Sequence, residues 1–292
     1  MNQHFDCVIV GGGIAGMTAA IYLKRANKNV VIVEKDILGG QINKTSRVEN
    51  YPGFTFIEGI DLVNKIKEQI RNLNIPIINK EVVEIKQNEI KLKDEILETD
   101  NIILATGRIP KKLGLENEDE LIGRGISYCA TCDGFFFKNK IVCVVGGGNS
   151  ALEESLYLSN LCKKVIILNR SAKLRADDYL IDEVNKRNNI EIKYNIEIIK
   201  INKDEVLKSV TTKNEEIKCD GLFIYIGLEP QIEYLKNSDI KTENGYVLVD
   251  SNMKTNIENI YACGDLIKKE AYQIITAASE GAKAAISCER GL

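Results

Sequence analysis

The residues with the clearest chemical potential in this chain are Cys129 and Cys132, which lie in the stretch RGISYCATCDGFFF (124–137) and are followed directly by Asp133. A C-x-x-C pair can form half of a zinc site, a structural disulfide, or a redox pair that opens and closes during turnover. A zinc site needs two more ligands, so we predict no metal site. The remaining cysteines are isolated and are expected to be small buried apolar residues: Cys7, Cys143, Cys162, Cys219, Cys263 and Cys288.

The composition is that of a soluble globular protein of about two domains, with 292 residues, 44% of them hydrophobic and 28% charged. The net charge of −3 gives no support to nucleic-acid binding, and no apolar run is long enough to span a membrane. The N-terminus has no signal-peptide layout, which predicts a reducing cytoplasm, where a close cysteine pair is more often catalytic or metal-binding than structural. The only histidine, His4, is expected in a frayed, solvated terminus, so hydrolytic Ser–His and Cys–His pairs are not indicated.

A first glycine motif predicts a dinucleotide site near the N-terminus. The stretch FDCVIVGGGIAGMTAAIYLKR (5–25) combines an apolar strand, the pattern Gly11, Gly13 and Gly16, and helical spacing. Such glycines permit a tight turn, close approach of a pyrophosphate, and close packing of helix on strand. The next apolar strand ends at Glu34, the acid expected to bind ribose hydroxyls.

A second motif repeats this layout at KIVCVVGGGNSALEESLYLS (140–159), with Gly146, Gly148 and Ala151 in register and another apolar strand at 163–169. Two complete motifs favour a flavin enzyme that is reduced by a nicotinamide over a simple dehydrogenase, which needs one dinucleotide. The alternative is a duplicated nucleotide fold in which one site is inactive.

The two motifs differ at the residue that contacts the ribose. Glu34 of the first motif corresponds to Asn169 of the second, and Arg170 follows directly. A carboxylate would repel a 2′-phosphate, whereas a neutral residue beside an arginine accommodates one. The loop also contains Lys173 and Arg175, although Lys173 alone would be read as a solvated loop residue. The first site therefore suits FAD, and the second favours NADPH.

Each half of the chain is expected to contain a dinucleotide fold, a small antiparallel insert and a closing strand that ends in glycine. These inserts are expected at 80–100 and 190–201, and the closing strands at 101–107 and 220–230. A long amphipathic helix is predicted at 271–291.

The tail beyond residue 244 has no counterpart after the first closing strand, so the chain is expected to leave the first domain near 113 and return near 245. The predicted fold class is α/β, with two Rossmann-like three-layer dinucleotide-binding domains, the second inserted into the first. The first, an FAD-binding domain, comprises 1–113 and 245–292. The second, an NADPH-binding domain that carries the C-x-x-C pair, comprises 114–244, and the two crossings supply a hinge.

A series of short motifs spans the whole chain in a specific order. They are GGQ (39–41), ENYPGF (49–54), ATG (105–107), CATCDG (129–134), GGGNSALEE (146–154) and CGDLIKKEAYQ (263–273). In this respect the chain resembles the low-molecular-weight bacterial thioredoxin reductases. The disulfide reductases that resemble glutathione reductase carry C-x4-C in the FAD domain and a late catalytic histidine, and this chain has neither.

The resemblance implies a cytoplasmic, homodimeric flavoprotein that passes electrons from NADPH through FAD and the Cys129–Cys132 disulfide to thioredoxin. It implies that Cys132 faces the flavin, that Cys129 attacks the partner disulfide, and that Asp133 protonates a leaving thiolate. The alternatives are a related flavoprotein that feeds a peroxidase or another dithiol partner, and a redox-sensing flavoprotein.

The resemblance and the two motifs also give candidate binding residues. For FAD they are Gly11, Gly13, Ile14, Ala15, Gly16, Glu34, Lys35, Gly39, Gly40, Gln41, Asn50, Val83, Ala105, Thr106, Gly107, Gly264, Asp265, Tyr272, Gln273 and Ile274. For NADPH they are Gly147, Gly148, Asn149, Ser150, Asn169, Arg170, Arg175, Ile226 and Gly227.

The chain departs from the family pattern in two places. The family sequence of histidine and two arginines, with a further arginine four residues on, is replaced by Asn169, Arg170 and Ser171, then Arg175. Tyr272 stands where an arginine usually precedes the glutamine. The first departure predicts a weaker preference for NADPH over NADH than in relatives with all the arginines.

Overall fold

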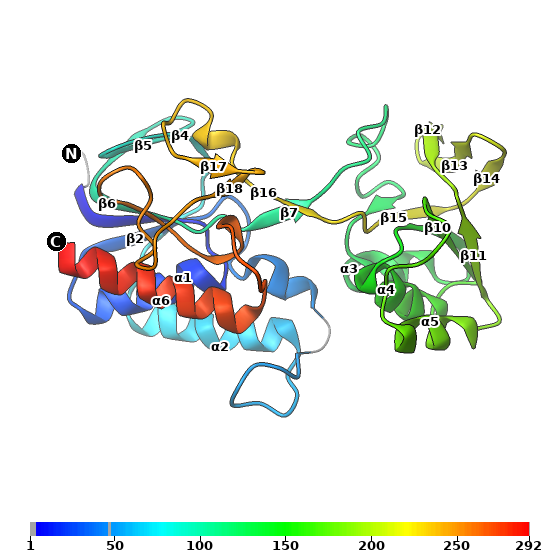
Figure 1. Cartoon of the computed structure of the whole chain (residues 1–292), viewed down its shortest axis with the longest axis horizontal. Helices are drawn as coiled ribbons and strands as arrows, with labels where there is room; N and C mark the ends of the chain where they lie inside the picture. Colours follow the sequence, from blue (N-terminus) through cyan, green and yellow to red (C-terminus); the bar gives the residue numbers. More distant parts are fainter. Residues whose placement is uncertain (1–3, 46–47, 292) are drawn as a thin grey trace. The chain divides into compact units, whose positions relative to one another are not determined.

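The computed structural model describes residues 4–45 and 48–291 (Figure 1). The chain divides into two compact units, residues 1–109 with 229–292 (unit 1) and residues 110–228 (unit 2). The second unit is thus inserted into the first. The return to unit 1 comes earlier than residue 245, because Tyr234 and Leu235 are already buried in the core of unit 1.

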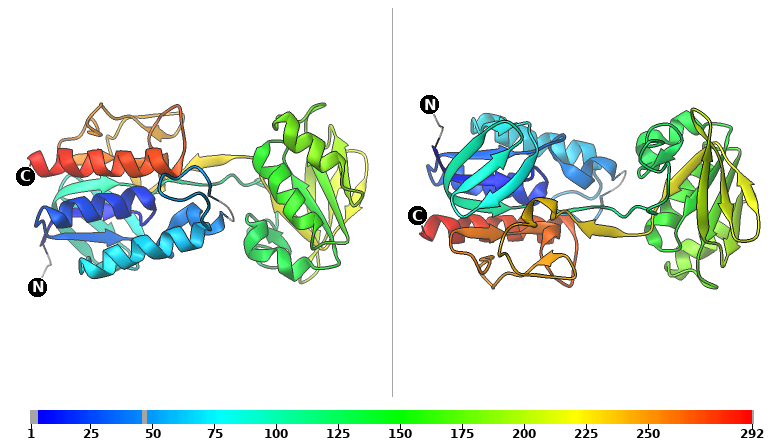
Figure 2. Two further views of the ribbon diagram at one scale, coloured as in Figure 1. Left: turned by 90° about the horizontal axis from the view of Figure 1, so that it is seen from below. Right: turned by 90° about the horizontal axis from the view of Figure 1, so that it is seen from above.

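Unit 1 is built on a seven-stranded sheet with the order β3-β2-β1-β6-β5-β4, and β19 pairs with β6. The strands are β1 (His4–Val10), β2 (Val30–Val33), β3 (Ile77–Ile78), β4 (Val82–Lys86), β5 (Glu89–Leu92), β6 (Ile96–Leu104) and β19 (Ile260–Ala262). Helices α1 (Ile14–Arg25), α2 (Gly59–Asn72) and α6 (Ile274–Gly291) lie side by side on one face of this sheet (Figures 1 and 2). The elements predicted around the first glycine motif are therefore present.

Helices α1 and α6, the first and last of the chain, pack unusually closely. A Cβ atom at Gly281 of α6 would lie 2.1 Å from the carbonyl oxygen of Ala15 in α1. A Cβ atom at Gly16 would lie 1.9 Å from the carbonyl oxygen of Gly11. Gly281 is thus required by the packing of α6 on α1, and Gly16 by the close approach of α1 to the first glycine turn.

Strand β6 unites two stretches that the sequence analysis treated separately. Its first residues pair antiparallel with β5, and its later residues pair parallel with β1 and β19. The antiparallel insert at 80–100 and the closing strand at 101–107 are therefore continuous, and the strand ends just before the ATG motif.

Unit 2 contains a five-stranded parallel sheet in the order β11-β10-β9-β15-β8. Its elements are β8 (Ile126–Ser127), α3 (Ala130–Asp133), η2 (Gly134–Phe137), β9 (Ile141–Val145), α4 (Asn149–Ser159), β10 (Lys164–Asn169), α5 (Asp178–Asn185), β11 (Ile190–Tyr194), β12 (Ile198–Lys203), β13 (Leu207–Thr212), β14 (Glu216–Lys218) and β15 (Gly221–Ile224). Only β12, β13 and β14 form the antiparallel insert. The prediction for 190–201 was wrong in its first part, because β11 pairs parallel with β10.

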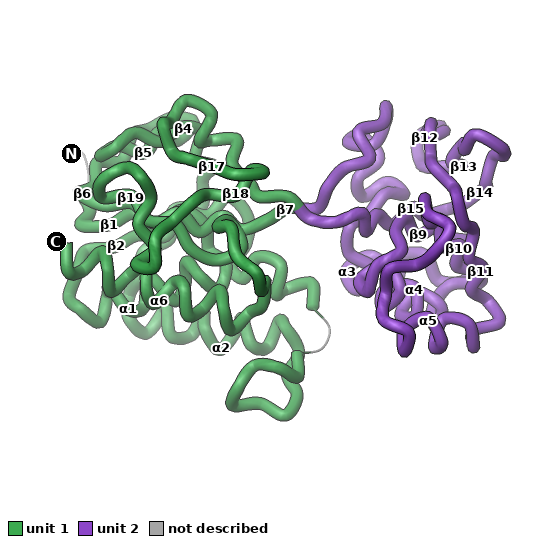
Figure 3. Tube along the Cα trace, viewed as in Figure 1, with its two compact units in different colours: residues 1–109, 229–292 green, residues 110–228 purple. Residues whose placement is uncertain are grey.

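The chain passes between the units twice, and the two passages pair as β7 (Arg108–Pro110) and β16 (Leu228–Pro230) (Figure 3). After the second passage follow η3 (Glu233–Leu235), β17 (Thr242–Glu243), β18 (Tyr246–Val247) and η4 (Gly264–Leu266), while η1 (Gly40–Lys44) lies in the first segment. The expectation for His4 was partly wrong. Its side chain is exposed, but it begins β1, and its Nε2 lies 3.1 Å from an Asp100 carboxylate oxygen.

Two observations concern possible functions of the described residues. Within residues 4–45 and 48–291, no helix is long and apolar enough to cross a membrane. In the same part of the chain, no group of three or more His, Cys, Asp or Glu side chains is arranged to hold a metal ion.

Candidate active site

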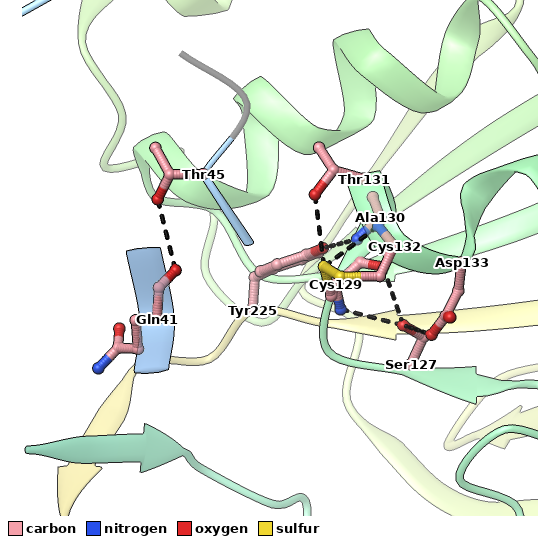
Figure 4. The surroundings of a disulfide bond; sticks show 9 residues. All are labelled: Gln41, Thr45, Ser127, Cys129, Ala130, Thr131, Cys132, Asp133 and Tyr225. Carbon is pink, nitrogen blue, oxygen red and sulfur yellow. Dashed lines mark hydrogen bonds between the residues drawn. A yellow bond between two sulfur atoms is a disulfide. The ribbon is translucent and has the colours of Figure 1, made fainter. Parts of the chain in front are cut away.

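Cys129 and Cys132 form a disulfide at the start of α3, with their Cα atoms 5.3 Å apart (Figure 4). Cys129 occupies the N-cap position of this short helix, and its Sγ accepts a hydrogen bond from the backbone N–H of Cys132 at 3.2 Å. The pair is therefore a disulfide of unit 2, and the helix start supplies a donor to the Cys129 sulfur.

The two sulfur-bearing residues differ in accessibility. Cys129 is only 7% exposed, whereas Cys132 is exposed. A thiol–disulfide exchange requires direct contact between the attacking thiolate and a sulfur of the partner disulfide. Of the two residues, Cys132 meets that requirement.

Ser127 links the disulfide to the neighbouring acid. Its hydroxyl, in a side chain buried at the end of β8, accepts a hydrogen bond from the Cys129 N–H at 3.0 Å and donates one to Asp133 Oδ2 at 2.7 Å (Figure 4). The sequence analysis predicted Asp133 but missed Ser127. A serine that lies two residues before the first cysteine carries no signal of its own.

Tyr225, which comes after the strand next to β8, also holds the start of α3. It follows β15 directly, and its hydroxyl accepts a hydrogen bond from the Ala130 N–H at 2.7 Å (Figure 4). Burial raises the pKa of Tyr225 well above its ordinary value, so the hydroxyl stays protonated. The sequence analysis missed this residue, because Tyr225 and Ala130 are far apart in the chain.

The first glycine motif brings together residues from four segments. Gly11 has a φ of +106°, and a Cβ atom there would lie 2.4 Å from the carbonyl oxygen of Ala105. The Gly39 N–H donates to the carbonyl oxygen of Gly12 at 2.8 Å. A Cβ atom at Gly264 would lie 2.8 Å from the Cβ atom of Ala15. The predicted GGQ, ATG and late GD motifs therefore surround the first glycine turn.

Further predicted residues of unit 1 form a polar network. The Arg108 guanidinium donates to Asp265 Oδ2 at 2.7 and 3.2 Å and stacks 4.0 Å from the Tyr272 ring centroid. The Gln41 side chain donates to the carbonyl oxygen of Arg108 at 3.0 Å. Tyr272, which stands where the family pattern has an arginine, thus contacts Arg108. Sequence reasoning missed Arg108, because it lies far from Asp265 and Tyr272 in the chain.

The other predicted residues of unit 1 are placed as follows. Asn50 Nδ2 donates to Gln273 Oε1 at 3.1 Å, and the Thr106 hydroxyl donates to the carbonyl oxygen of Gln231 at 2.9 Å. Lys35 is exposed beside Glu81, and Val83 is exposed on β4. Gly107 ends the ATG motif, and Ile14, Gly40 and Ile274 begin α1, η1 and α6.

The second glycine motif has the same close turn in unit 2. Gly146 has a φ of +142°, and a Cβ atom there would lie 2.4 Å from the carbonyl oxygen of Tyr225. Asn169 is buried at the end of β10, and its Nδ2 donates to the carbonyl oxygens of Ser171 and Lys173 at 2.8 and 3.0 Å. Asn169 therefore shapes the basic loop.

The other predicted residues of unit 2 lie around this turn. The Arg175 N–H donates to the carbonyl oxygen of Gly147 at 2.6 Å. Asn149 exchanges two hydrogen bonds with Asp177, and Ser150 is exposed in the first turn of α4. Ile226 and Gly227 follow β15.

Residues 5–282 match the model of one protein family, described as pyridine nucleotide-disulphide oxidoreductase. The chain belongs to this family. It is 39% identical over 299 residues to the thioredoxin reductase of Bacillus subtilis, and the alignment covers 99% of this chain and 95% of that protein. It is 41% identical to the thioredoxin reductase of Ureaplasma parvum, covering 98% and 96%. The crystal structure of Lactococcus lactis thioredoxin reductase superposes with a TM-score of 0.89 at 38% identity, covering 98% of each chain.

The two helix starts of this pyridine nucleotide-disulphide oxidoreductase fit pyrophosphate groups. Gly13 and Gly148 occupy the N-cap positions of α1 and α4, and neither helix has a side-chain cap. A Cβ atom at either glycine would meet no atom within 4 Å, so each turn leaves open space in front of the helix. Helix N–H groups and the macrodipole favour an anion at such a position.

The end of β2 fits the ribose of the first dinucleotide. Glu34 Oε2 accepts a hydrogen bond from the Gly12 N–H at 2.7 Å, and its Oε1 accepts one from the Asp36 N–H at 2.9 Å. The carboxylate is thus fixed beside the glycine turn. A carboxylate in this place can accept hydrogen bonds from ribose hydroxyls.

An acid of this oxidoreductase outside the predicted set, Glu154, is half-buried in α4. One carboxylate oxygen of Glu154, Oε2, has no hydrogen-bond partner among the described residues. Burial, and to a smaller extent the neighbouring charge of Glu153, raises the pKa of Glu154 to about 7. The charged carboxylate is therefore unfavourable in the folded protein.

The Glu154→Gln variant should be more stable than the parent protein at pH 8 and equally stable at pH 4. The pKa of Glu154 rises from 4.5 to about 7 on folding, so stability is lost as the pH rises through that window. At pH 8 the amide should recover about 2–3 kcal/mol of unfolding free energy. Urea unfolding at both pH values measures the difference. Glu153→Gln, an exposed neighbour, should recover much less, and an equal gain in both variants would contradict burial as the main cause.

Proposed function

We propose that this chain is a thioredoxin reductase that transfers electrons from NADPH through FAD and the Cys129–Cys132 disulfide to thioredoxin. The observation that carries the proposal is a disulfide with one accessible cysteine, in a chain that matches thioredoxin reductases from end to end. The predicted residues of the first glycine site are proposed to hold FAD, and those of the second to hold NADPH. When bound, FAD supplies two-electron transfer from the nicotinamide to the disulfide.

The proposed exchange with thioredoxin begins at Cys132. In the reduced enzyme, the Cys132 thiolate attacks a sulfur of the thioredoxin disulfide and expels the other sulfur as a thiolate. Cys129 then attacks Cys132 in the mixed disulfide, which re-forms the Cys129–Cys132 bond and releases reduced thioredoxin. Two electrons pass to thioredoxin in each cycle. The burial of Cys129 favours this assignment over the one implied by the resemblance, in which Cys129 attacks the partner.

Asp133 is proposed as the acid that protonates the departing thiolate. It follows Cys132 directly, and the Ser127 hydroxyl holds its carboxyl group beside the start of α3. The chain has only one histidine, His4, which lies in unit 1 at the start of β1. The hydrogen bond from Ser127, which keeps Asp133 beside the start of α3, supports the proposed role.

Asp133→Asn should lower thioredoxin turnover by about a hundredfold, the lower end of what a positioned proton donor contributes. Asparagine retains an oxygen that can accept from Ser127 but cannot donate an acidic proton. Stopped-flow kinetics should show that reduction of the flavin by NADPH is unchanged. Asp119→Asn, an exposed acid of the same unit, serves as the control. Unchanged turnover in Asp133→Asn would leave this residue only the role of a turn residue.

The proposed activity is tested by adding NADPH, the FAD-loaded protein and oxidised thioredoxin together. Consumption of NADPH that depends on thioredoxin, with formation of thioredoxin thiols, supports the proposal. A flavin that is bleached by NADPH without reduction of thioredoxin would point to a peroxidase-type or other dithiol partner. A flavin that NADPH does not bleach would point to a sensor.

We also propose that the protein works as a homodimer in the cytoplasm. The family resemblance supports the dimer, and the reduced thiols of Cys7, Cys143, Cys162, Cys219, Cys263 and Cys288 are typical of a reducing compartment. Sedimentation equilibrium of the FAD-loaded protein measures its mass in solution, and a monomer at micromolar concentration would contradict the dimer.

A further inference from the structure

A pocket of unit 2 lies where three segments of the chain meet. It has a volume of about 300 Å³ and is lined by Arg170, by Asn195, Ile196 and Glu197, and by Thr212, Lys213 and Asn214. This volume is at the lower end of the range for sites that take small ligands. Arg170 belongs to the predicted NADPH site, whereas the residues of the other two segments were not predicted.

The topology assigns this pocket to the adenosine half of a bound dinucleotide. Arg170 follows β10 directly, and Asn195 follows β11 directly, so both lie at the carboxyl edge of the parallel sheet. Dinucleotides bind at that edge, and the residue that ends the second strand of the fold contacts the adenosine ribose. In unit 2 that strand is β10, because the second glycine motif follows β9. The pocket therefore adjoins the place of the ribose 2′ substituent.

The charged groups of the pocket come from different elements. Lys213 lies in the turn between β13 and β14, and its Nζ is 3.1 Å from a carboxylate oxygen of Glu197. Both side chains are largely exposed, at 72% and 65%. Arg175, which the sequence analysis assigned to the same phosphate, is not among the lining residues. The pocket is thus lined by two cations, Arg170 and Lys213, and by one carboxylate, that of Glu197 between β11 and β12.

We propose that Lys213, together with Arg170, binds the 2′-phosphate of NADPH, and that Glu197 opposes this binding. This inference rests on the proposed use of a nicotinamide dinucleotide at the second site. The ammonium group of Lys213 supplies a cation from the antiparallel insert, in a chain that has Ser171 where the family pattern has an arginine. In the protein without coenzyme, Lys213 pairs with Glu197. A 2′-phosphate competes for the lysine and is repelled by the glutamate.

The opposite signs of the two charges give the test. Lys213→Ala should raise the Michaelis constant for NADPH by about two- to fivefold, the upper part of the range for one exposed ion pair, and leave that for NADH unchanged. Glu197→Gln should lower the Michaelis constant for NADPH by about two- to fivefold, again without effect on NADH. Lys213→Arg should restore most of the NADPH preference, since it returns a cation to the same turn.

Binding of nucleotide fragments to the FAD-loaded protein provides a readout that does not depend on turnover. Isothermal titration calorimetry should show that Lys213→Ala weakens 2′,5′-ADP and leaves 5′-AMP unchanged. Lys208→Ala is the matched control, because Lys208 lies on β13, the strand that leads into the turn of Lys213, beside Asp204 and outside the pocket. It should change neither affinity.

The results separate this inference from the proposed function. If Lys213→Ala weakens 5′-AMP and 2′,5′-ADP equally, or if Glu197→Gln leaves 2′,5′-ADP binding unchanged, the assignment of the pocket is wrong even if thioredoxin is reduced. If thioredoxin is not reduced but the predicted difference between the fragments is found, the assignment of the pocket holds and the proposed function fails.

Discussion

Cys132→Ser should lower thioredoxin turnover by about a thousandfold or more, because it removes the exposed cysteine of the disulfide. The variant should still bind FAD, and NADPH should still bleach the flavin, since neither glycine site involves this residue. Measurement of thioredoxin reduction in the steady state and of flavin absorbance in a single turnover separates the two effects. Near-normal thioredoxin reduction by Cys132→Ser would contradict the proposed electron path.

The matched variant, Cys129→Ser, should also lose turnover, but with a different product. Its Cys132 thiolate can attack an oxidised thioredoxin, whereas no second thiol remains to resolve the mixed disulfide. A covalent complex with thioredoxin should therefore accumulate in Cys129→Ser and not in Cys132→Ser, as measured by non-reducing electrophoresis and mass spectrometry. The reverse pattern would restore Cys129 as the attacking residue.

Glu118→Gln should destabilise the loop that enters unit 2. Glu118 is 2% exposed, and its carboxylate accepts hydrogen bonds from the N–H groups of residues 113, 114 and 115 at 2.9, 2.8 and 3.4 Å, and from the Tyr128 hydroxyl at 2.6 Å. A glutamine has one acceptor oxygen and would turn an amide N–H toward these donors. The expected loss is about 3–5 kcal/mol, since each hydrogen bond to a buried charge contributes about 1.5–3 kcal/mol.

Hydrogen exchange measures this effect where it occurs. The backbone amides of residues 113–115 should exchange at least about a hundredfold faster in Glu118→Gln, which corresponds to about 3 kcal/mol. Tyr128→Phe removes one donor and keeps the carboxylate, so it should cost less. Glu116→Gln, an exposed glutamate of the same loop, is the control and should change nothing. Equal protection of these amides in Glu118→Gln and the parent protein would show that the carboxylate does not hold the loop.

The elements around the two glycine motifs could be predicted because their signals are local. The turn at Gly11 needs a backbone conformation that glycine tolerates, and the helix that follows begins within a few residues. The same holds for Gly146 and α4. The C-x-x-C pair is equally local, since both cysteines lie in one helical turn.

The parts that sequence reasoning missed depend on contacts between distant segments. The role of Ser127 depends on its hydrogen bond to the Asp133 carboxyl group, and the role of Tyr225 on its hydrogen bond from the Ala130 N–H. Both contacts are visible only in the folded chain. The sequence around Lys213 is typical of a solvated turn between two strands. Its place in the pocket could be recognised only from the positions of the ends of β10 and β11. The apolar alternation of β11 is compatible with parallel and antiparallel pairing, so its partner could not be predicted from its own residues.

The discontinuity of unit 1 determines the order in which the protein can fold during its synthesis. Unit 2 is one uninterrupted segment, residues 110–228, and can complete its core before the remainder is translated. Unit 1 cannot, because its strand β19 and its 18-residue helix α6 follow unit 2 in the sequence. Until Gly281 reaches Ala15, the nascent chain carries a half-built first unit whose α1 surface is uncovered. On the ribosome, the inserted unit can therefore fold before the unit that surrounds it is complete.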